Sequence, residues 1–268
     1  MVFGLSAHRA REPPVSFAEK FAEAGWLYMG GLFPIDLIDN LRKETERQIH
    51  ELMDEESGHR GYLRVGDERV MLSVKLKGPF LNPLVYANPF LLTVLSHLLG
   101  PDMLIDSFTC VIAMPGAGEQ GLHNDHPALF PVKPSLESDL PPYAITVVIP
   151  LLDLTSETGT TRLFPGTHRG GEEKNPDLPY IGRGDGFLFD YRLRHQGTAN
   201  KSDVARPVLY VSYARPWFTD VSNFKRQPRI NIDREDVKRI PTEHWPLFRR
   251  VAGKGTIDLS EKELFPRD

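Results

Sequence analysis

The sequence predicts a mainly β protein, a double-sheet jelly roll with helices packed against it. Helical patterns are confined to residues 1–102, and the later segments are short, β-rich and bounded by Gly, Pro, Asn or Asp at the spacing of a sandwich or barrel. All-β barrels of 268 residues commonly form one unit. We therefore interpret residues 1–268 as one domain, with a helix-rich part at 1–102, a jelly-roll core at 103–218 and a C-terminal extension at 219–268.

The first predicted helix covers residues 16–24. Ser16 is a good N-cap, Phe17 and Phe21 are spaced four apart, and Gly25 ends the pattern. Residues 26–29 then favour a short strand.

A longer helix is predicted from Pro34 to about residue 54. An apolar stripe follows it, and the opposite face mixes acidic and basic side chains, so we expect it to pack on a sheet rather than bind a membrane or a partner. Residues 69–76 alternate as a strand does, and a third helix at 88–99 ends at Gly100-Pro101. The stripe consists of Ile35, Ile38, Leu41, Thr45, Ile49, Leu52 and Met53.

The β-rich core begins with a long apolar, β-branched run at 103–114, which ends at the turn Pro115-Gly116-Ala117-Gly118. A proline-rich loop at 130–142 is expected to form a lid over any site built on the segment before it. Further strands are predicted at 144–152, 161–164, 186–191 and 207–213.

Composition excludes several classes of function. The net charge of -4 and the pI near 6.2 give no electrostatic footprint for nucleic acid. Cys110 is the only cysteine, so no intrachain disulfide is expected. The N-terminus lacks the apolar length of a signal peptide, and no run approaches the ~20 apolar residues of a membrane-spanning helix, so we expect a cytoplasmic protein. The C-terminal extension is expected to wrap the barrel or a neighbouring subunit, which leaves a homodimer open.

A candidate metal site follows the first core strand. His123 and Asp125 lie two apart, so on an extended chain both side chains point the same way and can chelate one ion. The pair alone is weak evidence, because nine histidines and eighteen aspartates in 268 residues give about 0.6 His-x-Asp occurrences by chance. His195, which follows a turn and strand and precedes a polar loop, is the best third ligand. Two histidines and one aspartate suit Fe(II) as a facial triad, and they suit Zn(II) as well.

Arg206 lies eleven residues after His195, at the start of the next predicted strand. An arginine inside an apolar barrel is costly unless it meets an anion, and its planar fork matches a carboxylate. A 2-oxoacid cosubstrate would need such a clamp beside Fe(II). A surface arginine is an equally good interpretation of this position alone.

Four segments, taken together, resemble the phytanoyl-CoA dioxygenase family of Fe(II)/2-oxoglutarate oxygenases. The order and spacing of these segments make a chance similarity implausible, and the resemblance implies the cupin-like double-stranded β-helix fold. The segments are 120–125, which reads Gln-Gly-Leu-His-Asn-Asp; 149–169, with Glu157-Thr158-Gly159 and Pro165-Gly166-Thr167-His168; 184–195, from Gly184-Asp185-Gly186 to His195; and 200–206, from Asn200-Lys201-Ser202 to Arg206.

The resemblance implies roles for six residues. His123, Asp125 and His195 would bind iron and carry catalysis with O2, and Arg206 would hold the distal carboxylate of 2-oxoglutarate. Gln120 and Thr161 would complete the cosubstrate pocket, although Thr160 is an alternative to Thr161. The family often has a serine-type residue two after the distal histidine, and this chain has Gly197 there, so Thr198 or Ser202 would have to supply a hydroxyl.

The expected function is the oxidation of a C–H bond in a small-molecule substrate, with hydroxylation as the default outcome. The preferred substrate class is a secondary metabolite. Asp125 is present where related halogenases have Gly or Ala, which favours oxygenation over halogenation. Two alternatives stay open: a cupin-like hydrolase or isomerase that does not use 2-oxoglutarate, and a non-catalytic jelly-roll binding protein. His126 and His168 are expected not to bind metal, His168 because it belongs to a Pro-Gly-Thr-His turn.

Overall fold

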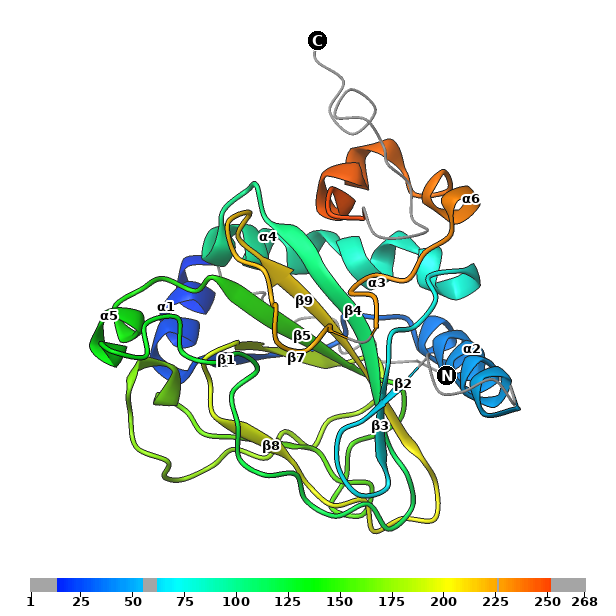
Figure 1. Cartoon of the computed structure of the whole chain (residues 1–268), viewed down its shortest axis with the longest axis horizontal. Coiled ribbons are helices and arrows are strands. Elements are labelled where there is room, and N and C mark those ends of the chain that lie inside the picture. The colour runs from blue at the N-terminus through cyan, green and yellow to red at the C-terminus, as the bar shows by residue number, and fades with distance from the viewer. Residues whose placement is uncertain (1–13, 55–61, 226, 252–268) are drawn as a thin grey trace, which may run out of the picture.

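The computed structural model describes residues 14–54, 62–225 and 227–251. Its main layer is an antiparallel sheet of seven strands in the order β1-β7-β5-β9-β4-β3-β2, and a two-stranded sheet, β6-β8, lies across the barrel from it (Figure 1). Strands that are distant in sequence are therefore neighbours in space. This arrangement confirms the predicted mainly β jelly roll.

The strand bounds agree with the sequence-based prediction to within a few residues, with two strands missed. β2 and β8 were not predicted, and residues 73–76 hold only an isolated bridge between Lys75 and Asn231 instead of extending β3. The strands are β1 Trp26–Met29, β2 Tyr62–Arg64, β3 Arg69–Leu72, β4 Leu104–Ala113, β5 Ala144–Pro150, β6 Thr161–Leu163, β7 Gly186–Asp190, β8 His195–Gly197 and β9 Arg206–Ala214.

The helices of the N-terminal third cover one face of the large sheet (Figure 1). Successive residues of a strand point to opposite faces, and the outward positions of β4, β5 and β9 are apolar, so they pack against the helices in one core. This core confirms the predicted packing of helices on the sheet. The helices are α1 Pro14–Ala24, α2 Ile35–Asp54, α3 Pro83–Ala87 and α4 Pro89–Leu99, with the 3-10 helix η1 Gly78–Leu81 before α3.

Local chemistry explains where α4 begins and ends. The Asn88 side chain accepts hydrogen bonds from the backbone N–H groups of Phe90 and Leu91, which would otherwise lack partners at the helix start. Pro89 at the first position needs no partner. Gly100 ends the helix at φ 92°, a conformation that favours glycine.

The described part of the C-terminal extension packs on its own chain. It contains α6 Arg234–Val237 and η3 Thr242–Phe248, and the Phe248 ring stacks edge-on against Tyr86 with 5.0 Å between ring centroids. The part of the extension that the structure describes therefore lies against its own chain, which gives no support to a homodimer. Among the described helices, none has the length and apolar character needed to cross a membrane.

Candidate metal centre

The segment that carries His123 and Asp125 is held beside β8 by backbone hydrogen bonds. His123 and His195 exchange two N–H···O bonds of 3.0 and 2.9 Å, and the Gln120 N–H donates to the Gly197 carbonyl at 2.9 Å. Residues 120–125 thus extend the small sheet by one more antiparallel partner. This pairing brings together two histidines that are 72 residues apart in the chain.

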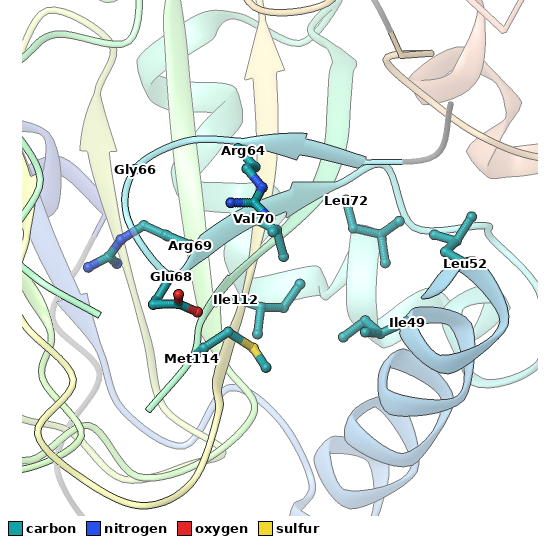
Figure 2. A pocket seen from close by; sticks show the side chains of 10 residues that line it. All are labelled: Ile49, Leu52, Arg64, Gly66, Glu68, Arg69, Val70, Leu72, Ile112 and Met114. Carbon is teal, nitrogen blue, oxygen red and sulfur yellow. The ribbon is translucent and has the colours of Figure 1, made fainter. Parts of the chain in front are cut away.

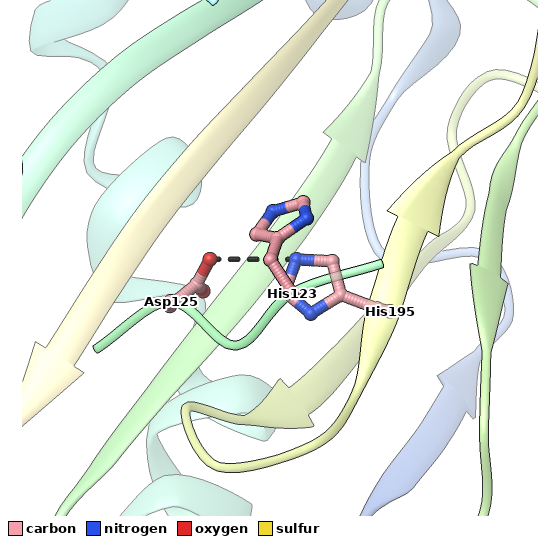
Figure 3. A group of neighbouring side chains, drawn as sticks. All are labelled: His123, Asp125 and His195. Atoms are coloured by element: carbon pink, nitrogen blue, oxygen red, sulfur yellow. Dashed lines mark ion pairs between the residues drawn. The ribbon is translucent and has the colours of Figure 1, made fainter. Parts of the chain in front are cut away.

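The three predicted ligands meet at one point inside the barrel (Figure 3). One ligand atom from each of His123, Asp125 and His195 lies within 4.8 Å of the others. The two imidazole rings are 4.4 Å apart between centroids, and Asp125 Oδ1 lies 3.4 Å from His195 Nε2. Thr146 of β5 donates to Asp125 Oδ2 at 3.1 Å and so fixes the carboxylate from the main sheet.

The hydrogen bonds of the two histidines orient their free nitrogens toward this point. His123 Nδ1 lies 2.8 Å from the Gly121 carbonyl, and His195 Nδ1 lies 2.9 Å from the Leu193 carbonyl. A carbonyl oxygen only accepts, so each Nδ1 donates its hydrogen and each Nε2 is the nitrogen available to a metal. Two Nε2 atoms and one carboxylate oxygen fit a facial-triad ion.

The electrostatics of the three groups are mutually dependent. Burial tends to raise the pKa of Asp125, but the neighbouring His195 and His123 outweigh it and hold that pKa below its usual value. Burial tends to lower the pKa of His195, and Asp125 outweighs it and raises that pKa. The pKa of His123 is lowered, first by burial and then by His195. Asp125 therefore carries the negative charge that a cation needs.

Two other histidines lie near the site without joining it. His126 packs its ring edge-on against Phe218, 5.1 Å between centroids. His168 is buried in η2, Thr167–Arg169, where Nε2 lies 3.2 Å from the Ala22 carbonyl and the ring packs on Gly25. Its packing agrees with the predicted role of holding a turn.

The ligands face a cavity of about 660 Å³ between the two sheets. Thr161 lines it, is 5% exposed, and lies 3.3 Å from the Tyr210 hydroxyl. Thr160 instead hydrogen-bonds to the Pro179 carbonyl. Of the two threonines, Thr161 is therefore the one that faces the cavity.

Gln120 also lines the cavity, with both ends of its amide in use. Its Oε1 accepts from the Gly197 N–H at 3.1 Å, and its Nε2 donates to the Val65 carbonyl at 3.3 Å. The side chain is thus held in a fixed position at the cavity wall.

Arg206 is buried, at 4% exposure, and no carboxylate pairs with it among the described residues. Its guanidinium donates to the carbonyls of Thr158 at 2.8 Å and Thr198 at 3.2 Å. Burial, and after it the nearby Arg69, lower its pKa to about 10, while Tyr210 opposes both. The structure thus excludes the alternative of a surface arginine.

Arg69 is a second buried guanidinium that the sequence analysis missed. It is 2% exposed and donates to the same Thr198 carbonyl, at 3.2 Å, and to that of Gly118 at 2.8 Å. Burial lowers its pKa, Tyr210 opposes this in part, and no carboxylate among the described residues pairs with it. Alternation along β3 places Arg69 on the same face as Met71, which lines the cavity, but only the structure shows that this face is the buried one.

Two glycines make room for these arginines. A Cβ at Gly159 would lie 2.2 Å from Arg206 Nη1 and 2.3 Å from the Ala199 carbonyl oxygen, and the residue has φ 79°. A Cβ at Gly197 would lie 2.4 Å from Gln120 Oε1 and 2.9 Å from Arg69 Nη1. The glycine where the family often has a serine-type residue therefore admits Gln120 and Arg69.

The two hydroxyls expected to replace that serine are both engaged elsewhere. Thr198 Oγ1 donates to the Thr160 carbonyl at 3.0 Å, and Ser202 bonds to Asn200 within its own turn at 2.6 Å.

The loop at 130–142 does not line the metal-site cavity. It contains α5, Pro134–Ser138, and its Glu137 accepts from the Leu129 N–H at 2.9 Å and the Tyr143 hydroxyl at 2.8 Å. The loop borders an adjoining polar cavity of about 720 Å³, which shares Asn124 and Asp125 with the first. These bonds fix Glu137 to the chain on either side of the loop, and the role of the loop as a lid stays a prediction.

A third, smaller cavity lies on the outer side of β3 (Figure 2). It measures about 130 Å³ and is bordered by Ile49 and Leu52 of α2 and by outward residues of β3 and β4. Arg69 points away from it, toward the barrel interior. This cavity is separate from the metal centre. Among the aromatic residues between 143 and 218, Tyr191 lines the main cavity, whereas Tyr143, Tyr213 and Phe218 are buried in apolar clusters and Trp217 is 62% exposed.

Comparison with known proteins finds one family model, described as phytanoyl-CoA dioxygenase (PhyH), which matches residues 21–208. Dioxygenase aneA of Aspergillus aculeatus is 23% identical over 270 residues, covering 95% of this chain and 90% of the relative. Dioxygenase af480 of Aspergillus fumigatus is 31% identical over 146 residues, covering 51% of this chain and 46% of the relative, so the chain spans about half the length of that protein.

Solved structures with the same fold include HygX from Streptomyces hygroscopicus, determined with nickel and 2-oxoglutarate bound. Its TM-score is 0.60 at 15% identity, covering 76% of this chain and 88% of HygX. AviO1 from Streptomyces viridochromogenes has a TM-score of 0.59 at 20% identity, covering 78% of this chain and 97% of AviO1. These likenesses confirm the predicted fold, and the His-Asp-His cluster is consistent with the use of Fe(II), 2-oxoglutarate and O2.

Proposed function

Because the chain belongs to the phytanoyl-CoA dioxygenase family, we propose that it is an Fe(II)/2-oxoglutarate-dependent dioxygenase that hydroxylates a C–H bond of a small molecule, a secondary metabolite. The observation that carries the proposal is the pairing of two features at one cavity. Three ligand atoms lie within 4.8 Å of one another at the cavity, and two buried guanidiniums without a described carboxylate partner lie near Tyr210, which lines the same cavity.

In this proposal, His123, Asp125 and His195 hold Fe(II). Their donor set fits the ion, because each Nδ1 donates to a backbone carbonyl and leaves Nε2 to face the metal, and Asp125 is charged. Thr146 orients the carboxylate, and the Gly121 and Leu193 carbonyls orient the rings. When bound, the iron with 2-oxoglutarate and O2 supplies the oxidising chemistry.

Arg206 and Arg69 are proposed to bind the distal carboxylate of 2-oxoglutarate. Their described hydrogen bonds use two N–H groups of each guanidinium at most, and a guanidinium has five. A carboxylate would supply the acceptors and the negative charge that burial makes necessary. Thr161 and Gln120 are proposed to flank the cosubstrate from β6 and from the loop before His123.

The protein's own contribution to the reaction is to bind the metal and cosubstrate, to orient the substrate and to exclude water. The ligand set is fixed on a segment paired with β8, and the substrate is positioned from the cavity side by side chains of the main sheet. Hydroxylation is the proposed outcome. Among proteins of the same fold, SnoN is named an epimerase and SnoK a carbocyclase, so the outcome depends on how the substrate is held.

An anaerobic titration with Fe(II) and 2-oxoglutarate tests the proposal. We expect a weak visible charge-transfer band in the wild type and its loss in His123→Ala and Asp125→Ala. His97→Ala, an exposed histidine on α4, is the matched control and should keep the band. A wild type without the band, or a band that persists in both ligand variants, would refute the proposal.

Two other functions make opposite predictions for the arginine. A cupin-like hydrolase or isomerase that does not use 2-oxoglutarate would keep its activity in Arg206→Ala. A non-catalytic binding protein would release no succinate with any substrate. The buried, unpaired state of Arg206 favours the dioxygenase over both.

A further inference from the structure

The inner face of the central strands is polar close to the metal centre. On β4, β5 and β9 the outward side chains are apolar, whereas several inward ones carry hydroxyl groups. A buried sheet face is usually apolar because an unpaired hydroxyl loses its hydrogen bonds to water. The inward hydroxyl residues are Ser107 and Thr109 of β4, Thr146 of β5, and Tyr210 and Ser212 of β9.

Three of these residues form one row across the sheet that starts at the metal centre. Thr146 is registered with Ser212, and Ser212 with Ser107. Thr146 is also the residue that donates to the Asp125 carboxylate. Since neighbouring strands lie about 4.8 Å apart, Ser107 is about 10 Å from Thr146 across the sheet. The row therefore leads away from the metal centre along the cavity floor.

The row lies at the opposite end of the cavity from the two arginines. Arg206 and Ser212 are six residues apart on β9, which corresponds to about 20 Å along the strand at ~3.3 Å per residue. The proposed carboxylate-binding end and the hydroxyl row are therefore separate along the sheet, and Thr146 of the row contacts the metal ligand Asp125. A substrate can occupy the hydroxyl end while the cosubstrate occupies the other.

Two of the hydroxyl groups have no hydrogen-bond partner among the residues that the structure describes. Thr146 and Ser212 lie 3.4 Å apart, and the Tyr191 hydroxyl donates to Ser212 at 3.2 Å. Ser107 and Thr109, by contrast, are 2% and 4% exposed, line the cavity, and form no side-chain hydrogen bond to any residue that the structure describes. A ligand with matching polar groups would satisfy both hydroxyls, and an apolar ligand would leave them unpaired.

The charges around the cavity restrict the ligand further. No lysine or arginine is among the described residues that line it. Asp67, Glu119 and Asp220 do line it, but Glu119 pairs with Arg162 at 3.0 Å, and the Asp220 carboxylate accepts from the N–H groups of Ser222 and Asn223. A phosphorylated substrate or a coenzyme A thioester would find no cation there. The chemistry fits a neutral ligand.

From these observations we propose that the substrate is a neutral, hydroxyl-rich molecule of the glycoside class, and that Ser107 and Thr109 are the residues that select it. This inference rests on the proposed function, since it identifies the substrate of that same site. An apolar terpenoid or acyl chain would place carbon against two unpaired hydroxyls and is selected against.

Matched probes test the proposal by calorimetry on enzyme loaded anaerobically with Fe(II) and 2-oxoglutarate. The probes are the phenyl glycosides of glucose, galactose, mannose and xylose, and cyclohexyl phenyl ether, which has a similar shape without the hydroxyls. We expect at least one glycoside to bind the wild type more tightly than the ether. Ser107→Ala combined with Thr109→Val should weaken that glycoside by about tenfold or more, because two hydrogen bonds are lost, and should leave binding of the ether unchanged.

Thr109→Ser, made with Ser107 unchanged, keeps the hydroxyl and is the matched control, so it should retain glycoside binding. The charge-transfer band, recorded on the same samples, reports separately on the metal and cosubstrate. Loss of the band in the wild type overturns the proposed function, whereas an intact band with no glycoside bound more tightly than the ether overturns the substrate class. An unaltered glycoside affinity in the double variant overturns the role of the two residues. If the double variant loses the band, the single variant Thr109→Val, which preserves side-chain volume, is used instead. An unaltered glycoside affinity in that variant overturns the role of Thr109.

Discussion

Arg69 of β3 and Arg206 of β9 are both registered with Ala113, which lies between them on β4, so two guanidiniums reach the same place on the inner face of the sheet. Both are buried, and both donate to the Thr198 carbonyl at 3.2 Å. The two guanidiniums carry like charges and repel each other, so Arg69 contributes to the lowered pKa of Arg206. An anion between the two guanidiniums would offset the cost of burying their charges and would reduce the repulsion between them.

Replacing Arg206 should therefore reduce the stabilisation that 2-oxoglutarate gives. A ligand present at 100 times its Kd stabilises a protein by about 2.7 kcal/mol, which corresponds to a rise in Tm of roughly 5 to 11 °C for a chain of this size. We expect Arg206→Met to weaken 2-oxoglutarate by about 10- to 150-fold, since a charged hydrogen bond contributes about 1.5 to 3 kcal/mol. Thermal melts with and without 2-oxoglutarate, at constant Fe(II) and without oxygen, measure the difference. Arg42→Met, on an exposed face of α2, should retain the full shift.

Arg69→Met should lower the affinity for 2-oxoglutarate to a similar degree, although sequence reasoning did not assign it a role. In a double-mutant cycle with Arg206→Met the two losses should not add, because both side chains address one carboxylate. The charge-transfer titration gives all four affinities. Strictly additive losses would mean that the two arginines act on separate groups.

How far the sequence predicts this site depends on how local the signal is. His123 and Asp125 are two apart, and His195 and Arg206 have a fixed spacing, so a resemblance over four short segments was enough to nominate them. Arg69 lies in a strand whose partner, β4, is more than thirty residues away, and nothing in its neighbours distinguishes it from an exposed arginine. Only the pairing of β3 with β4 brings it opposite Arg206.

The fold shows the same division. Long apolar runs and capped helices were predicted to within a few residues, because their signals are local: Asn88 and Gly100 delimit α4 by their own chemistry. β8, Tyr62–Arg64 and the helix in the 130–142 loop were missed, because such short elements exist only through their partners. His195–Gly197 is a strand because Thr161–Leu163 lies beside it.

Gly197→Ser should weaken 2-oxoglutarate even though it introduces the type of residue that the family often has there. A Cβ at this position would lie 2.4 Å from Gln120 Oε1 and 2.9 Å from Arg69 Nη1, so both side chains would have to move. We expect a loss of about tenfold in affinity, comparable to one displaced charged hydrogen bond. Gly182→Ser, where a Cβ meets Asp153 only at an ordinary 3.7 Å, is the control. An unchanged affinity in Gly197→Ser would show that Arg69 and Gln120 do not need this space.

Thr146→Val should weaken Fe(II) while leaving the fold intact. The substitution keeps the side-chain shape and removes the 3.1 Å hydrogen bond to Asp125 Oδ2, so the carboxylate loses its support from β5. Partners of this kind typically contribute 10- to 100-fold in metal affinity or activity. Metal titration of the apo protein measures the change, and Thr146→Ser, which retains the hydroxyl, should restore most of the affinity. Equal affinities in Val and Ser variants would assign the threonine a packing role only.

Asp106→Ala should destabilise the wall of the cavity without removing the metal centre. Asp106 is 1% exposed, its Oδ1 accepts from Arg250 at 2.8 Å, and its Oδ2 accepts from the Asp220 N–H at 3.2 Å. These bonds tie the chain after β9, which carries Asn223 and Phe224 to the cavity, back onto β4. Burial raises the pKa of Asp106 while Arg229 opposes this, so the carboxylate depends on its partners, and removing it leaves Arg250 without its acid. Breaking a buried ion pair typically costs about 3 kcal/mol, which corresponds to a fall in Tm of roughly 6 to 12 °C. Thermal melts of Asp106→Ala measure this fall. Asp102→Ala, at an exposed residue beside the same strand, is the control. Asn223 of this wall donates to the Asp125 carbonyl at 2.7 Å, but the pairing with β8 and the bond from Thr146 also hold the ligands. The charge-transfer band should therefore survive in Asp106→Ala, and its loss would show that the wall is needed to keep the ligands in place.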